Sequence, residues 1–108
     1  MEYSVTPAEL VTIFCPTGAD TSRVQEHFTA AGGGYTSTSG LSHWLGSGGY
    51  KLTEQAAVFT VVVDAKQHLG VDVAIKVASL FLEDNPHERE ALCIVQDAYG
   101  PHTIRVTR

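Results

Sequence analysis

Hydrophobic residues recur along the chain with two different periods, and the change between them predicts the first elements. Residues 10–15 form an apolar run of β-branched and aromatic side chains that ends at Pro16, which is typical of a strand. Val24, Phe28 and Ala31 then recur every three or four residues and predict an amphipathic helix. The chain is therefore expected to begin with a strand followed by a helix.

Glycine and hydroxyl residues mark the ends of that helix and the start of a hairpin. Ser22 followed by Gln25 predicts a capping box at the helix start, and the three glycines at 32–34 predict its end, because glycine readily adopts the left-handed conformation. Residues 35–41 alternate aromatic or small side chains with hydroxyls, which predicts a half-exposed strand. Residues 43–51 contain three glycines and a serine and predict a hairpin loop.

The second half of the chain repeats the strand and helix pattern. A strand is expected over residues 56–64, and its core AAVFTVVV is too continuously apolar for an edge strand, which favours a central position. A helix is expected from about residue 67 or 71 to 84, ending at Asn85-Pro86, and its apolar arc is wider than the usual 100° or so. Either this helix is deeply buried or a partner covers one flank. Residues 91–95 predict a fourth strand, and residues 102–106 can pair as a short fifth strand.

The order βαββαβ predicts an α+β, ferredoxin-like fold, in which an antiparallel sheet has two helices on one face and leaves the other face open. The 108 residues match one ordinary domain, so residues 1–108 are expected to form a single domain. Charged residues make up 18% of the chain, below the roughly 25% usual for such domains. An open sheet face in a chain with so few charges favours packing against identical subunits, so a homo-oligomer is expected.

Charge and hydropathy exclude two classes of partner. Seven Lys and Arg residues are scattered among twelve Asp and Glu, giving a net charge of −5, which argues against binding to a nucleic-acid backbone. No apolar run approaches the 18 or so residues of a membrane span, and the N-terminus lacks the pattern of a signal peptide. The sequence therefore predicts a cytoplasmic protein without nucleic-acid or membrane partners.

Cysteine and histidine positions give no preset reactive or metal site. Cys15 and Cys93 lie inside apolar strand-like runs and are expected to be buried, reduced thiols, with a disulfide or a reactive thiol as the alternative. The five histidines are at least 15 residues apart, so no pair has metal-ligand spacing. A metal site assembled in space, for instance from His43 and His87 across an interface, is the alternative. No cofactor is predicted.

Side chains suited to ligand binding gather on and beside the predicted hairpin loop. They are His43, Trp44, Tyr50, Lys51 and Glu54. Trp44 and Tyr50 offer flat faces on which a base or another aromatic ligand can stack, and Lys51 can attract a phosphate or a carboxylate. The alternative is that Trp44 packs on the sheet or on a neighbouring subunit while Lys51 is solvated.

Charged residues of the last third of the chain add one candidate. Arg105 is one of the few cations able to offset an anionic ligand; the alternative is that it faces water or Asp97. An acidic cluster surrounds the end of the second predicted helix and is expected to be a surface turn without function. Its members are Glu83, Asp84, Glu88 and Glu90.

Short motifs around the hairpin resemble those of a known family. They are Gly34-Tyr35, Gly40, His43-Trp44-Leu45-Gly46, Tyr50 and Thr53-Glu54, followed by the apolar run AAVFTVVVD and later by Glu90-Ala91-Leu92-Cys93-Ile94-Val95. They resemble the strands and the Trp-x-Gly loop of the PII/CutA-like signalling and metal-tolerance superfamily, and of a related set of small bacterial and phage proteins. PII-like proteins are typically homotrimers that bind nucleotides between subunits, so the resemblance implies a trimer with ligand sites at subunit junctions.

Three function hypotheses follow. The first is a non-enzymatic oligomer that binds or sequesters a nucleotide or a nucleotide-derived signal at subunit interfaces, either as a regulator of a partner or, if phage-encoded, as a sponge for a host signal. The second is a small ferredoxin-fold enzyme with His43 or His87 as its base. The third is a structural or protein-interaction module that uses its open sheet face.

Overall fold

Strands and helices follow one another in the predicted order. The computed structural model describes residues 1–45, 49 and 51–108, without the side chain of Trp44. The elements of the described residues are β1 (Ala8–Pro16), α1 (Ser22–Gly32), β2 (Thr36–Leu45), β3 (Lys51–Asp64), α2 (Gly70–Asp84), β4 (Glu90–Asp97) and β5 (Gly100–Thr107). This confirms the ferredoxin-like α+β fold, including the extra C-terminal strand.

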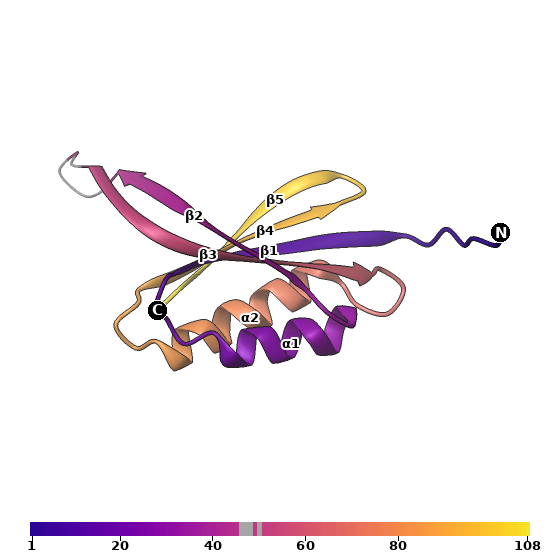
Figure 1. Ribbon diagram of the computed structural model, residues 1–108, viewed down its shortest axis with the longest axis horizontal. Coiled ribbons are helices and arrows are strands. Elements are labelled where there is room, and N and C mark those ends of the chain that lie inside the picture. The colour runs from indigo at the N-terminus through magenta and orange to yellow at the C-terminus, as the bar shows by residue number, and fades with distance from the viewer. Residues whose placement is uncertain (46–48, 50) are drawn as a thin grey trace.

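The five strands form one antiparallel sheet in the order β2-β3-β1-β4-β5. The central strand, β1, pairs with β3 on one side, where Val11 lies opposite Val61, and with β4 on the other, where Val11 lies opposite Val95. Both helices cover the same face of this sheet (Figure 1). The prediction of a two-layer fold with one open sheet face is thereby confirmed.

Alternation along the strands assigns side chains to the two faces. On β1, Val11, Ile13 and Cys15 point to the helices and are at most 1% exposed. They pack with Phe28 of α1 and Phe81 of α2 in the core. Burial of each large apolar side chain contributes roughly 1.5–3 kcal/mol, so this layer between sheet and helices provides most of the stabilisation.

The ends of α1 follow the sequence prediction at one end only. The helix begins after Thr21, the amide side chain of Gln25 donates to the Thr21 hydroxyl at 2.8 Å, and the Ser22 N–H donates to the Asp20 carboxylate at 3.1 Å. The predicted Ser22–Gln25 capping box is therefore wrong, because Ser22 already belongs to the first turn. Gly33 ends the helix with a φ of 78°, which confirms the predicted glycine cap.

The wide apolar arc of α2 results mainly from deep burial. This helix packs against α1, β1, β4 and β5. Seven of its apolar side chains are buried, namely Val73, Ala74, Val77, Ala78, Leu80, Phe81 and Leu82. Val71 and Ile75 remain 36% and 46% exposed on the outer flank. The first of the two predicted explanations therefore accounts for most of the arc.

The hairpin strands are longer than predicted. β2 extends to Leu45 and β3 starts at Lys51, so His43 and Lys51 lie in strands rather than in the predicted loop, and Glu54, predicted beside the loop, lies in β3. The ladder between β1 and β3 ends where Pro16 pairs with Ala56, whereas β2 and β3 stay paired up to Leu45 and Lys51. We call residues 41–45 and 51–55 the hairpin arm; it projects away from the helices (Figure 1).

The two cysteines are free and buried, as predicted. Burial raises the pKa of both the Cys15 and the Cys93 thiol to about 12, so neither is a thiolate near neutral pH. Both act as small core residues. Among the described residues, no helix combines the length and the hydrophobicity needed to cross a bilayer.

Candidate functional site

A pocket with a volume of about 260 Å³ opens on the sheet where β1 ends and where β3 and β4 begin. Because β3 and β4 both run antiparallel to β1, Ala56 of β3 lies beside Pro16 and Leu92 of β4 lies beside Phe14, on either side of the end of β1. The lining residues come from five segments of the chain. They are Phe14, Cys15, Pro16, Ser42, Leu52, Glu54, Ala56, Phe81, Glu88, Glu90 and Leu92.

Apolar side chains form the floor of this pocket. Phe14 pairs with Leu92 across β1 and β4, and Pro16 pairs with Ala56 across β1 and β3, all on the open face. Leu52, nearer the start of β3, is 46% exposed. Such a floor can bury the flat face of an aromatic or heterocyclic ligand.

Three carboxylates also line this pocket. Glu54 comes from β3, Glu90 from β4, and Glu88 from the segment between α2 and β4. Glu54 and Glu88 are half-buried, and Glu90 is exposed. We call this site the acidic pocket, since its lining contains three acidic side chains and no basic one.

Arg105 lies beside the acidic pocket. Its Nη1 atom is 3.6 Å from Oε1 of Glu90, on the neighbouring strand. Asp97, its predicted alternative partner, instead accepts from the Tyr99 N–H at 2.8 Å and contacts His102 at 3.1 Å, and these contacts lower the pKa of its carboxyl. Arg105 therefore offsets one of the three carboxylates and leaves the pocket with an excess of negative charge.

His43 and Lys51 lie on the opposite face of the hairpin arm from Glu54. Successive residues of a strand point to opposite faces, so residues 51 and 53 of β3 share one face and residue 54 lies on the other. His43 of β2 is paired with Thr53, and its Nδ1 atom lies 3.1 Å from the Thr53 hydroxyl. Together with Leu45, these three residues line a separate hollow of about 370 Å³.

The structure therefore divides the predicted site residues into two groups. The side chain of Trp44 and all of Tyr50 lie outside the described residues.

The acidic cluster near the end of α2 also divides into two pairs. Glu83 and Asp84 bind Arg23 of α1 at 2.8 and 2.6 Å, and the hydrogen bonds from Arg23 lower the pKa of the Asp84 carboxyl. Glu88 and Glu90 instead line the pocket. The sequence prediction of a turn without assigned chemistry missed this second pair, because their approach to Glu54 depends on the order of strands in the sheet.

Histidines are absent from the lining of the acidic pocket. The side chain of His87 is 75% exposed, 3.5 Å from Glu88. In the part of the chain that the structure describes, no group of three His, Cys, Asp or Glu side chains is placed to hold a metal ion. A His43–His87 pair across an interface stays a prediction.

Comparison with known proteins identifies shared folds only. No family model matches the sequence, and no curated protein matches it. A solved phage SAM lyase in complex with S-methyl-5′-thioadenosine is similar with a TM-score of 0.71 and 11% identity, over 100% of this chain and 95% of that one. CutA from Synechococcus elongatus PCC7942 is similar with a TM-score of 0.54 and 11% identity, over 98% of this chain and 80% of that one.

A third similar structure is much longer than this chain. A Bacillus cereus protein related to NIF3 matches with a TM-score of 0.60 and 15% identity, over 97% of this chain but only 28% of its own. At such identities, structural likeness shows the fold and no activity. The fold-level part of the predicted resemblance, likeness to CutA, is confirmed.

Proposed function

We propose that this protein binds a phosphate-free, nucleoside-derived small molecule with a positively charged group in the acidic pocket. The observation that carries the proposal is a pocket that has an apolar floor and the carboxylates of Glu54, Glu88 and Glu90 in its lining. The floor suits a base, and the carboxylates suit ribose hydroxyls and a cation. S-adenosylmethionine, a nucleoside with a sulfonium and an ammonium group, has this chemistry.

Charge is the reason for preferring a ligand without phosphate. A phosphate charge about 4 Å from one carboxylate costs roughly 1 kcal/mol in water and several times more in a partly desolvated site. Three carboxylates with one flanking arginine therefore favour a cation over the anionic nucleotide expected from Lys51 and Arg105. The S-methyl-5′-thioadenosine in the similar phage SAM lyase, also a nucleoside without phosphate, supports this preference.

The proposal includes assembly from identical subunits, with a trimer as the expected form. Most lining side chains of the pocket point to the open sheet face, where Leu10, Leu52 and Val62 are 37%, 46% and 56% exposed, whereas Cys15 and Phe81 line it from the helix side. Its volume of about 260 Å³ is slightly below the roughly 300–1,000 Å³ of typical ligand sites, so a neighbouring subunit would complete it. Native mass spectrometry of the untagged protein measures subunit number and any retained ligand together; a monomer at micromolar concentration would contradict this part.

Calorimetric titration tests the ligand class directly. We expect S-adenosylmethionine to bind more tightly than S-methyl-5′-thioadenosine, and ATP to bind weakest. Glu54→Gln removes one pocket charge and should weaken S-adenosylmethionine binding roughly ten- to a hundredfold, as loss of a charged hydrogen-bond partner costs on the order of 1.5–3 kcal/mol. Glu83→Gln is the matched control, because Glu83 belongs to the same acidic stretch of sequence but binds Arg23.

Two results would overturn the proposed ligand class. One is an absence of binding by both nucleosides. The other is tight ATP binding that Lys51→Ala abolishes and Glu54→Gln leaves unchanged, which would move the site to the opposite face of the hairpin arm and restore the anionic nucleotide.

An enzyme acting on the same ligand is the second candidate. The likeness to a SAM lyase over the full length of this chain favours it. His43 and His87 do not line the acidic pocket, so its carboxylates are the residues left there to accept a proton. Incubation with S-adenosylmethionine followed by mass spectrometry separates the candidates: an unchanged ligand supports binding alone, whereas turnover lost in Glu54→Gln supports the enzyme.

A further inference from the structure

The segment between α2 and β4, which contains Glu88, is fastened by a single arginine. Arg108 donates from Nη2 to the carbonyl oxygens of Leu82 and Asn85, and from Nε to the carbonyl oxygen of Glu88 at 3.0 Å. Its backbone N–H donates to the Arg89 oxygen at 2.9 Å. One residue thus contacts the last turn of α2 and both halves of the following segment.

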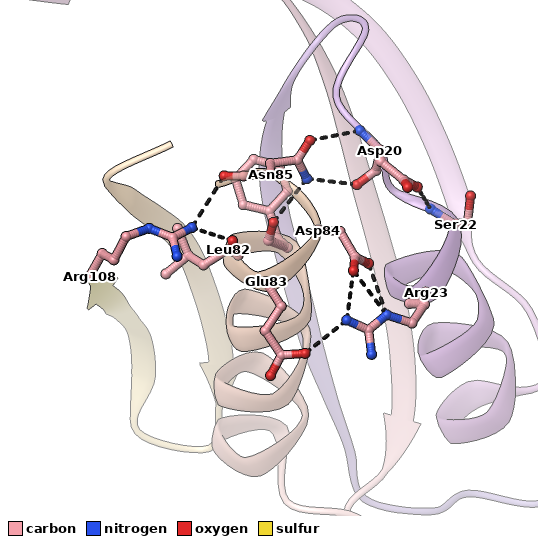
Figure 2. A network of polar contacts seen from close by, with 9 residues as sticks. Asp20, Ser22, Arg23, Leu82, Glu83, Asp84, Asn85 and Arg108 are labelled. Atoms are coloured by element: carbon pink, nitrogen blue, oxygen red, sulfur yellow. Dashed lines mark hydrogen bonds and ion pairs between the residues drawn. The ribbon is translucent and has the colours of Figure 1, made fainter. Parts of the chain in front are cut away.

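Asn85 fastens the same segment from the other side. It is 3% exposed and the one buried polar residue in the described part of the chain. Its side-chain NH₂ group donates to the backbone carbonyl oxygens of Asp20 and Phe81 at 2.8 and 2.9 Å. Its Oδ1 atom accepts from the backbone N–H of Asp20 at 2.9 Å. Figure 2 shows Asn85 between Asp20 and the end of α2, with Arg108 on the opposite side.

These contacts fix a segment that would otherwise have few restraints. The last carbonyl groups of a helix have no partners within the helix, and a cation near them is favourable. The planar guanidinium donates in fixed directions, so it sets the relative positions of the carbonyl groups that it joins. The Glu88 N–H also donates to the Asn85 oxygen at 2.9 Å, which places Glu88 one turn from the fastened residue.

We propose that Arg108 is a positioning residue for the acidic pocket, which holds the wall formed by Glu88 and Glu90 in place. Arg108 itself does not line the pocket. The inference rests on the proposed function for its consequence in binding, whereas its structural half concerns the free protein. The positioning role makes the affinity for the proposed ligand depend on Arg108, a side chain that does not itself line the pocket.

Arg108→Ala tests the positioning role, with Arg23→Ala as the matched control. Arg23 contacts Glu83 and Asp84 at the same end of α2 but nothing in residues 85–90. In the free protein, we expect Arg108→Ala to speed amide exchange at Glu88 at least tenfold and to shift the carboxyl ¹³C resonances of Glu88 and Glu90. Arg23→Ala should leave both readouts unchanged. Arg108→Lys keeps the charge without the fork and serves if the alanine variant unfolds.

S-adenosylmethionine titration then tests the consequence for binding. Because the effects of neighbouring residues in contact are energetically coupled, we expect Arg108→Ala to raise Kd about tenfold and Arg23→Ala to raise it less than twofold. In a Glu88→Gln background, Arg108→Ala should have little further effect, because the carboxylate that it positions is gone.

The outcomes separate the two ideas. Unchanged exchange and resonances in both Arg108 variants overturn the positioning role, whether or not the ligand binds. The other combination is that amide exchange changes in Arg108→Ala but the wild-type protein binds no nucleoside. That result overturns the proposed function and still supports the positioning of the wall by Arg108. Full additivity of Arg108→Ala and Glu88→Gln in Kd overturns the claim that Arg108 acts through Glu88.

Discussion

The two faces of the sheet are built from the same apolar runs but have different surroundings. On β1, Val11 and Ile13 point to the helices and have no exposed surface, whereas Thr12 and Phe14, their neighbours in sequence, lie on the open face and keep part of theirs. The covered face unites sheet and helices, and the open face carries the acidic pocket. A strand that is apolar throughout its length can therefore have one face buried in the core and the other face partly exposed.

The largest expected contrast between the faces comes from two phenylalanines. Phe28→Ala empties a fully buried site in the covered layer and should lower the free energy of unfolding by about 3–5 kcal/mol. Phe14→Ala removes a partly exposed ring from the open face and should cost about 1–2 kcal/mol, since less area leaves water there. Urea denaturation of both variants measures the difference. Equal losses would break the comparison and mean that a neighbouring subunit buries Phe14 as completely as the helices bury Phe28.

Two glycines at the end of α1 test how tightly the helix layer packs against the sheet at its edge. A Cβ on Gly32 would lie 2.4 Å from Cγ2 of Val61 and 2.5 Å from the Val62 oxygen, because α1 approaches β3 closely there. Gly32→Ala should therefore cost about 1–3 kcal/mol through overpacking. Gly34→Ala meets nothing within 4 Å and should change stability little. Thermal denaturation of both proteins would contradict this explanation if the two alanines behaved alike.

A pair of hydroxyls tests the open face itself. Thr12 and Thr60 share a hydrogen bond of 3.0 Å across β1 and β3. Thr12→Val leaves the Thr60 hydroxyl without this partner and should cost about 1 kcal/mol, whereas valine at both positions should be close to neutral. A double-mutant cycle measures the coupling. If the losses in free energy of unfolding of the two single variants simply add up in the double variant, water replaces the lost partner and this face is fully hydrated.

The smallest effect concerns the outer surface of the helix layer. Burial, followed by the positive charges of Lys76 and His68, lowers the pKa of His27 below its ordinary value of 6.5. The unfolded chain therefore binds a proton more readily than the folded protein does. Stability should be full above pH 6.5 and decline as the pH falls through the folded pKa.

His27→Gln removes the contribution of this group. Stability curves of the two proteins between pH 5 and 8 should therefore converge at the alkaline end and separate toward acid, with the variant flatter. A wild-type curve as flat as that of the variant would show that His27 is as well hydrated in the folded protein as in the unfolded chain.

The sequence was sufficient for the order of the elements, because each has a clear hydrophobic period. It misjudged the hairpin, where glycines and a serine favour a loop but the ladder between β2 and β3 continues to Leu45 and Lys51. That register decides which side chains share a face, and so it separates His43 and Lys51 from Glu54. A longer predicted strand with strict alternation would have found this separation.

The pocket itself was not predictable from local pattern. Glu54 and Glu90 lie far apart in sequence and meet because β3 and β4 flank the end of β1. The available clue was that a glutamate lies shortly before each of these two predicted strands, Glu90 one residue before residue 91 and Glu54 two residues before residue 56. In the ferredoxin-like order, residues at those two starts share one end of the sheet, so applying the predicted topology to charged residues would have identified the pair.

The hairpin arm gives the two walls of the acidic pocket unequal mechanical properties. Glu54 and Leu52 lie on a two-stranded ribbon, a structure that is only marginally stable without further packing. Glu88 and Glu90 belong to a wall joined to the helix layer by Asn85 and Arg108. If the proposed ligand binds here, the hairpin arm is therefore the wall expected to adjust to ligands of different thickness, whereas the wall of Glu88 and Glu90 is expected to stay in place.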